Sequence, residues 1–407
     1  MPTYITRSNT NYTVNNVDLA SNGFVTREYI IDVYPSLAAQ FKQAGLWTWG
    51  RNNNGQLGDG TVVDRSSPVQ TIAGGSNWQF VSSGKYNMSA IKTDGTLWVW
   101  GLNTDGQLGD TTRTHRSSPV QTIAGGTTWK QVSSGFATTS AIKTDGTLWI
   151  WGHNSYGQIG DTTRTARSSP VQTIAGGTNW KQVSSDGSSF NVAAVKTDGT
   201  LWLWGSNTSG QLGDTTRTHR SSPIQTIAGG TTWIQVSLGA ASVATIKTDG
   251  TLWTWGTNST GILGDGTVTS RSSPVQTIAG DTTWKEVNNG GTNNIAIKTD
   301  GTLWVWGWND QGQLNDGTLI HRSSPVQTVA GGTNWKKAVI GNKRYVMALK
   351  TDGTLWTWGQ NDFGQLGDDT KTKRSSPIQT IAGGTNWKFV SNDVVSAAIR
   401  DDSMDPI

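Results

Sequence analysis

A Leu-Trp-x-Trp-Gly motif occurs seven times along this 407-residue chain, and successive copies start 51, 51, 53, 51, 51 and 52 residues apart. The copies are Leu46–Gly50, Leu97–Gly101, Leu148–Gly152, Leu201–Gly205, Leu252–Gly256, Leu303–Gly307 and Leu355–Gly359. Self-similarity with a period of about 50 residues is typical of solenoids, propellers and arrays. The fold must therefore follow from what one unit forms and how the units join.

Each unit predicts four short β-strands. In the second unit the segments TLWVWG, SPVQTI, WKQVSS and SAIKT are each bounded by Gly, Pro, Asn or Asp, which favour turns. KTDGTLW predicts a hairpin, because Asp-Gly stands between two alternating runs. Only two of the 28 acidic residues are Glu, and there are 51 glycines, a composition that disfavours helices. An all-β fold is expected.

Seven such units predict a seven-bladed β-propeller of four-stranded antiparallel blades. A solenoid would need atypical units at its ends, whereas the first and last copies here are as regular as the others. Because the Asp-Gly hairpin joins one sequence unit to the next, the blades should be offset from the units. We therefore expect the strands in Leu46–Ile72 and in Trp387–Arg400 to complete one shared blade, which hides open strand edges.

The chain is expected to have three parts: an N-terminal arm (residues 1–45), the propeller (46–400) and a loose tail (401–407). Within the arm, Ser36–Gly45 predicts one short helix, with Ser36 as its N-cap. The arm is too short and polar to form a core alone, so we expect it to dock on a partner. Its candidate docking residues are Tyr29, Ile30, Ile31, Tyr34 and Leu37.

Several classes of function are disfavoured by composition. The net charge of +4 is spread along the chain without a basic run, so specific binding of nucleic acid is not expected. The absence of cysteine excludes disulfides and thiol catalysis. No apolar stretch is long enough to span a membrane, and the N-terminus has no signal-peptide pattern, so synthesis in a cytoplasm is expected.

No residues match a catalytic, cofactor-binding or metal-binding pattern. His115, His219 and His321 occupy one unit position in non-adjacent units, which keeps them too far apart for a single ion. An Arg and an Asp recur in all seven units, for example Arg116 and Asp110, and we expect them to brace each loop. Twenty-one of the 22 tryptophans also recur, three per unit, and are expected to be structural; Trp308 is the exception. We predict a protein that is not an enzyme.

Differences between units should mark the binding surface, because the shared residues are explained by the fold. They concentrate in loops, where single aromatic residues stand among Asn, Ser and Thr. Such rigid rings form good recognition surfaces for protein or sugar, although they can also simply pack over the blade ends. The candidate interaction residues are Tyr86, Phe136, Tyr156, Phe190, Trp308, Tyr345 and Phe363.

The unit pattern of WGxNxxGQLG, a Pro-Val strand and VSxGxxxxxAIKTDG resembles the repeats of the regulator of chromosome condensation family, from Leu46 to about Arg400. The resemblance implies the propeller but not one activity, because that fold hosts unrelated functions. The founding members act on a small GTPase and bind chromatin. This chain lacks a basic tail for DNA and leaves no room in its units for a protruding wedge.

The near-identical units and the segment FVTREYIIDVYPSL before the first repeat resemble bacteriophage virion proteins, notably of marine phages. That resemblance implies a structural protein of a virion tail, fibre or particle surface, oligomeric within the particle and without a cofactor. The arm would contact other virion proteins, and the propeller would face a host-surface protein or glycan. Two alternatives stay open: a protein-interaction scaffold of the chromosome condensation regulator type, exchange-factor-like or inhibitor-like, and a lectin-like sugar binder.

Overall fold

The computed structural model describes residues 4–8, 11–15, 44–185, 190–342 and 344–401. The chain divides into two compact units, Met1–Gln43 and Ala44–Ile407. In the first unit, strands β1 (Tyr4–Ser8) and β2 (Asn11–Asn15) pair antiparallel. This hairpin was not expected from the Asn- and Thr-rich sequence of the arm. The five candidate docking residues lie outside the described residues, as does the predicted helix except for Ala44 and Gly45, and Gly45 is instead the first residue of a strand.

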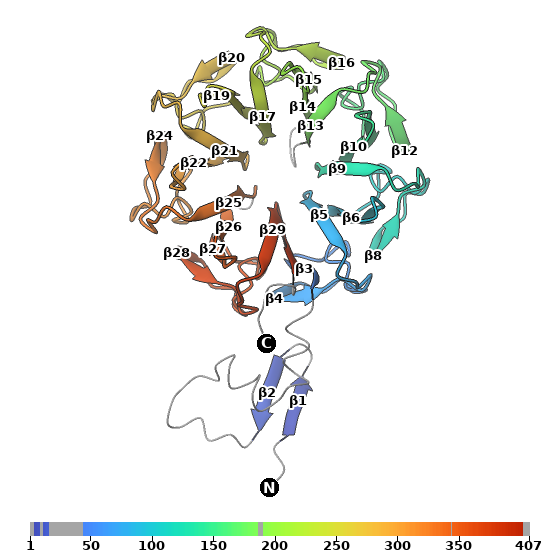
Figure 1. The fold of residues 1–407 in the computed structure, drawn as a ribbon, viewed down its shortest axis with the longest axis vertical. Helices are drawn as coiled ribbons and strands as arrows, with labels where there is room; N and C mark the ends of the chain where they lie inside the picture. The colour runs from blue at the N-terminus through green and yellow to red at the C-terminus, as the bar shows by residue number, and fades with distance from the viewer. Residues whose placement is uncertain (1–3, 9–10, 16–43, 186–189, 343, 402–407) are drawn as a thin grey trace. The chain divides into compact units, whose positions relative to one another are not determined.

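The second unit is a ring of seven four-stranded antiparallel blades, as Figure 1 shows. The innermost strands are β5 (Trp78–Ser83), β9 (Trp129–Ser134), β13 (Trp180–Ser185), β17 (Trp233–Leu238), β21 (Trp284–Asn289), β25 (Trp335–Ile340) and β29 (Trp387–Asn392). The second strands are β6 (Asn87–Lys92), β10 (Thr138–Lys143), β14 (Asn191–Lys196), β18 (Ser242–Lys247), β22 (Asn293–Lys298), β26 (Tyr345–Lys350) and β30 (Val395–Arg400).

Each LWxWG motif forms the third strand of a blade, and each Arg-Ser-Ser-Pro segment begins the outermost one. The third strands are β7 (Leu97–Gly101), β11 (Leu148–Gly152), β15 (Leu201–Gly205), β19 (Leu252–Gly256), β23 (Leu303–Gly307), β27 (Leu355–Gly359) and β3 (Gly45–Gly50). The outermost strands are β8 (Arg116–Gln121), β12 (Arg167–Gln172), β16 (Arg220–Gln225), β20 (Arg271–Gln276), β24 (Arg322–Gln327), β28 (Arg374–Gln379) and β4 (Arg65–Gln70). Proline within this outermost strand limits its pairing with other chains.

The two ends of the propeller sequence share one blade. Its strand order is β29–β30–β3–β4, and β3 pairs along its length with β30, for example Trp47 opposite Ala398. The predicted closure is therefore confirmed. No helix among the described residues is long and apolar enough to cross a membrane.

The hydrophobic core is divided among the seven seams between neighbouring blades. One cluster, for example, joins Leu97 and Leu108 of blade β5–β8 to Trp129, Val132 and Trp151 of blade β9–β12. The other six seams have equivalent clusters. Stability of each blade thus depends on both neighbours, so a closed ring leaves no seam exposed.

The recurring Arg and Asp brace each loop, as expected. In blade β5–β8 the Arg116 guanidinium lies 2.8 Å from Oδ2 of Asp110. The other carboxylate oxygen, Oδ1, accepts hydrogen bonds from Thr112 and from the Asn103 amide. The same Arg–Asp pair occurs in all seven blades. Burial raises the pKa of Asp110, but the hydrogen bonds outweigh it, and the pKa lies below its usual value.

Candidate interaction face

The strand directions place two loops of every blade on one face of the ring. The innermost and third strands run in the same direction, so the loops that follow them leave the blade at the same end. We call this the loop face. The opposite face, which we call the hairpin face, has the Asp-Gly hairpins and the connections between blades. Six of the seven candidate interaction residues lie in loops of the loop face; Tyr345 does not.

Short loops after the innermost strands bring neighbouring blades close together. A Cβ added to Gly84 would lie 2.4 Å from the carbonyl oxygen of Gly135 in the next blade, so these loops pass within van der Waals contact. As a result Tyr86, two residues after Gly84, meets Phe136, which follows Gly135. The two rings pack edge to face with their centroids 5.8 Å apart. Lys85 lies over both rings, at 5.4 Å and 4.7 Å from their centroids.

The contacts continue in both directions along the face. Toward the closing blade, Arg51 lies 5.7 Å from the Tyr86 centroid and 5.0 Å from that of Phe363. In the other direction Phe136 contacts Phe190 at 5.3 Å, and Phe190 stacks on Tyr156 at 5.3 Å. We call the whole series the cation–aromatic arc; it consists of Phe363, Arg51, Tyr86, Lys85, Phe136, Phe190, His153, Tyr156 and His219.

His153 is held neutral within the arc by its two neighbours. Gln158 Oε1 accepts the Tyr156 N–H at 3.0 Å, which fixes the amide so that its Nε2 donates to His153 Nδ1 at 2.7 Å. His153 Nε2 then donates to Ser155 Oγ at 3.0 Å. Burial lowers the pKa of His153, and the Asp105 charge only partly opposes this. The ring packs on Phe190 with centroids 4.9 Å apart.

Trp308 belongs to a separate cluster on the loop face. Its ring packs 4.9 Å from His321 and lies 4.4 Å below the Arg344 guanidinium, which pairs with Asp310 at 2.9 Å. Among the described residues, no ring–ring or cation–ring contact joins this cluster to the cation–aromatic arc. The guanidinium is therefore neutralised locally.

Tyr345 was predicted as an interaction residue, but the structure places it in the core. It is the first residue of β26, it is 0% exposed, and its hydroxyl accepts a hydrogen bond from Ser396 Oγ at 3.0 Å. Burial raises the pKa of the Tyr345 hydroxyl. Tyr345 holds the position of Asn87 and Thr138, the buried first residues of their second strands, and Arg344 is the last residue of the preceding loop, with a positive φ of 56°.

The tips of the long loops differ in character between blades, and blade β25–β28 has the exposed Lys371 at this position. Blades β5–β8, β9–β12 and β13–β16 have exposed arginines at equivalent tip positions, Arg113, Arg164 and Arg217. Blades β17–β20 and β21–β24 have Val268, Leu319 and Ile320 there instead, each 63% exposed. The arginine tips therefore coincide with the part of the arc that contains Phe136, Phe190 and Tyr156.

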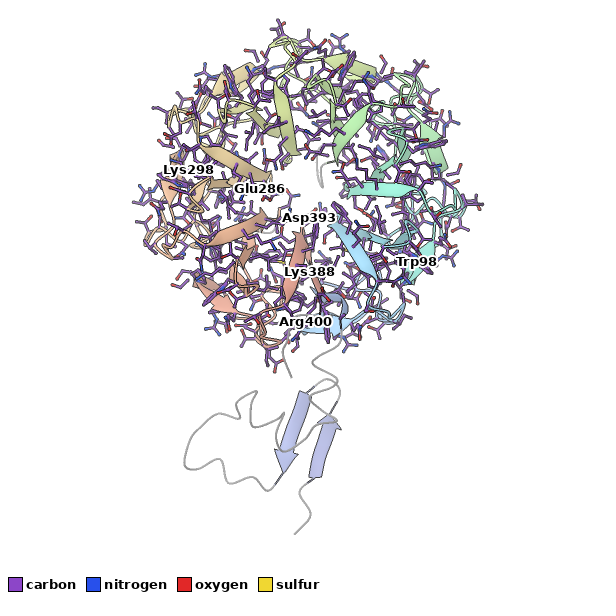
Figure 2. All side chains as sticks on the ribbon, viewed as in Figure 1. Trp98, Glu286, Lys298, Lys388, Asp393 and Arg400 are labelled. Atoms are coloured by element: carbon purple, nitrogen blue, oxygen red, sulfur yellow. The ribbon has the colours of Figure 1, made fainter. Side chains whose placement is uncertain are left out.

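The central channel ends at the loop face in a small polar cavity of about 130 Å³, lined by the last residues of the innermost strands. Ser82 and Ser133 of this lining each accept a backbone N–H from the next blade, at 2.9 Å. Figure 2 shows Asp393 and Glu286 near the channel, and Trp98 and Lys298 farther out. Drug-sized ligands need roughly 300–1,000 Å³, so this cavity fits only water or a small group.

The described residues contain no cluster of three or more His, Asp or Glu side chains arranged for a metal ion. The three histidines that share one unit position differ from one another in their contacts. His115 is exposed, whereas His219 and His321 each accept a backbone N–H at Nδ1, from Asn207 and Asn309. His219 and His321 take part in the interaction face through ring contacts, His219 with Tyr156 and His321 with Trp308.

The cations of the arc were missed by the sequence reasoning, which considered only rings. Arg51 and Lys85 differ from the residues at the same positions of other units, and this was the available signal. His153 is likewise the only histidine outside the shared position. Pairing of these cations with rings from other blades depends on the closed ring and could not be read from one unit.

The model of the regulator of chromosome condensation (RCC1) repeat matches residues 44–91, 94–142, 145–194, 198–246, 249–297, 300–348 and 352–398. The ultraviolet-B receptor UVR8 of Arabidopsis thaliana is 30% identical over 337 residues, which cover 81% of this chain and 76% of the receptor. The RCC1 domain-containing mitochondrial protein RUG3 of the same plant is 24% identical over 379 residues, 86% of this chain and 84% of RUG3.

Among solved structures, Prp20p of Saccharomyces cerevisiae superposes with a TM-score of 0.74 at 15% identity, covering 93% of this chain and 95% of Prp20p. At this identity the likeness shows the fold alone. None of these three relatives is a virion protein, so the expected phage resemblance has no support from them. Seven matched repeats in seven blades show that this chain belongs to the regulator of chromosome condensation (RCC1) repeat family.

Proposed function

We propose that this chain is a non-enzymatic protein-interaction scaffold that binds its partner with the loop face. The observation that carries the proposal is the cation–aromatic arc, which is built from loop residues that differ between otherwise near-identical units. The framework explains none of these residues, since the blades without them close equally well. Rings and guanidinium groups are also the side chains most enriched at the energetic centres of protein interfaces.

Two further observations support a surface that binds macromolecules. The cavity at the channel mouth is too small for most small-molecule ligands. Prp20p, which has the same fold, was described together with its binding to Gsp1p and histones. Incorporation into a virion through the arm stays a prediction, and co-sedimentation of the chain with purified particles tests it.

The test compares two triple variants in the same three blades. Tyr86→Ala/Phe136→Ala/Phe190→Ala removes three rings of the arc. Ile123→Ala/Ile174→Ala/Ile227→Ala removes three side chains that are 57–59% exposed at the ends of the outermost strands, away from the loop face. Partners captured by the wild-type chain are identified and purified, and their affinities for each variant are measured.

We expect the loop-face variant to bind at least about tenfold more weakly, the loss of roughly 1.4 kcal/mol, and the isoleucine variant to bind like the wild type. Both variants should remain folded, because all six side chains lie at the surface or half-buried. If the loop-face variant binds the partner as tightly as the wild type, the proposal is wrong.

A further inference from the structure

We infer that the partner segment bound by the loop face is acidic, and that it lies across blades β5–β8, β9–β12 and β13–β16. This inference rests on the proposed function and gives the chemistry of the partner. It is carried by the juxtaposition of two independent series: the arginine tips Arg113, Arg164 and Arg217, and the inner part of the cation–aromatic arc. We call these three blades the basic sector.

The positive charge of the basic sector is not neutralised within the described residues. Asp110, Asp161 and Asp214 in these loops are each paired with a framework arginine at 2.7–2.9 Å. Arg113 contacts only a carbonyl oxygen, that of Thr104 at 3.2 Å, and Arg164 and Arg217 have no ion pair in the described part of the chain. Asp105 is the one acidic residue described in these loops without a framework arginine as partner.

Lys85 adds a further cation at the inner edge of the basic sector. It is half-buried over Tyr86 and Phe136, so ordering it for a partner costs less side-chain entropy than ordering an extended surface lysine. The rings behind it also lower the local dielectric constant, which strengthens its attraction for a carboxylate. Inner Lys85 and outer Arg113 therefore give one blade two anchoring points for an acidic chain.

Stacking ligands fit the basic sector less well, because the ring faces are already covered. Lys85 covers Tyr86 and Phe136, and Phe190 stacks on Tyr156 with an interplanar angle of 29°. Single-stranded nucleic acids and sugars bind to such surfaces through open ring faces. What the sector presents to solvent is charge with an apolar backing, which suits Asp and Glu side chains interspersed with apolar ones.

The test uses three fluorescent peptides of equal length: one with alternating Glu and Leu, one with Gln for Glu, and one with Lys for Glu. Binding to the full chain is followed by anisotropy. The arginine variant, Arg113→Glu/Arg164→Glu/Arg217→Glu, is compared with the lysine variant, Lys130→Glu/Lys181→Glu/Lys285→Glu. The three lysines are exposed near the start of innermost strands, at the opposite end from the loop face, so the two variants change net charge equally.

We expect the Glu peptide to bind at least about tenfold more tightly than the Gln peptide, with an affinity that falls as salt is raised from about 0.05 to about 0.5 M. The arginine variant should lose this binding, and the lysine variant should keep it. Equal loss in both variants would reveal attraction to net charge alone and overturn the inference. Tighter binding of a thymidine oligonucleotide of equal charge would overturn it in favour of a nucleic-acid surface.

Failure of this inference is separable from failure of the proposed function. If the Glu peptide does not bind while the captured partner still requires Tyr86, Phe136 and Phe190, the acidic chemistry is wrong and the loop face stands. If the partner binds without those rings, the proposed function is wrong whatever the peptides do.

Discussion

Trp49 Nε1 donates to the backbone carbonyl of Gln365 at 2.8 Å, although the two residues lie 316 positions apart. The second tryptophan of every other LWxWG motif makes the same bond to the preceding blade, at 2.7–3.0 Å. The acceptor is a main-chain oxygen, so the bond persists where Ile262 replaces glutamine. LWxWG is thus a motif of the seams, and the bond from Trp49 closes the last of them.

Deletion of residues 387–407 should abolish the cooperative fold. It removes β29 and β30, and with them the partner strand of β3 and the cluster that contains Trp387, Val390 and Ala398. Circular dichroism during heating should show loss of the native transition. Deletion of 402–407, which leaves every described strand intact, is the control and should melt like the full chain. A cooperative melt at an unchanged temperature in the longer deletion would contradict closure by the terminal strands.

Two tryptophans of one motif should differ sharply in their contribution to stability. Trp151 is 0% exposed between two blades, and Trp151→Ala should cost about 3–5 kcal/mol through lost transfer energy and a cavity. Trp149 is half-buried under Lys143, whose Nζ lies 4.6 Å from its ring, and Trp149→Ala should cost only about 1–2 kcal/mol. Urea unfolding measures both. Equal losses of unfolding free energy in the two variants would show that burial of the ring does not determine its contribution to stability.

Much of the propeller could be predicted because its unit repeats. Seven copies of Asp-Gly between alternating runs fix the hairpins, and the uneven ends at Leu46 and Arg400 fix the closure. The different burial of the two tryptophans was not predicted. Alternation puts Trp149 and Trp151 on the same side of one strand, and only the neighbouring blade decides which of them is covered.

The interaction face could be predicted only in part. Loop aromatics that break the repeat were identifiable, and six of the seven lie on one face. Tyr345 lies in the core because it holds the position of Asn87 and Thr138, the buried first residue of the second strand, where most other blades have a polar residue. The pairing of Arg51 with rings from two other blades depends on tertiary structure, so no local pattern reports it.

Acid should destabilise the propeller through the seven loop carboxyls. The pKa of each of them is lowered: burial raises it, but hydrogen bonds from Thr and Arg outweigh burial. A carboxyl with a lowered folded-state pKa stabilises the protein above its usual value of 3.8, and this is lost as the pH falls through the folded-state pKa. Asp110→Asn should therefore melt below the wild type at pH 7, with a gap that narrows at about pH 3.

Asp105→Asn is the matched control for that experiment, because Asp105 has no framework arginine as partner. It should leave the melting temperature almost unchanged at neutral pH. A gap between Asp110→Asn and the wild type that stays constant with pH would show that the Asp110 charge is irrelevant.

Mild acid should lower the stability of the propeller through protonation of His153 in the cation–aromatic arc. The pKa of His153 is lowered by burial, so the unfolded chain binds the proton more readily than the folded one. The free energy of unfolding then falls as the pH drops below about 6.5, the ordinary pKa, and levels off below the folded-state pKa. His153→Asn cannot take up this proton. Between pH 7.5 and 5.5 its melting temperature should therefore decline less than that of the wild type, and the difference should match the protonation of a single histidine. Parallel declines would mean that His153 protonates without cost.

Phe190 should show a stability order opposite to the usual one. Its φ of 57° lies in the left-handed region, which costs a non-glycine residue roughly 1–2 kcal/mol. Phe190→Ala removes the ring but keeps this strain, whereas Phe190→Gly removes both, so the glycine variant should be more stable than the alanine variant by about 1 kcal/mol. At Phe136, which is not in the left-handed region, Ala should be the more stable of the two. All four variants lose ring contacts of the arc and should bind the partner more weakly. If Ala exceeds Gly at both positions in chemical unfolding, the loop holds no strain, and the fixed placement of Phe190 must come from its packing on Tyr156 and His153 alone.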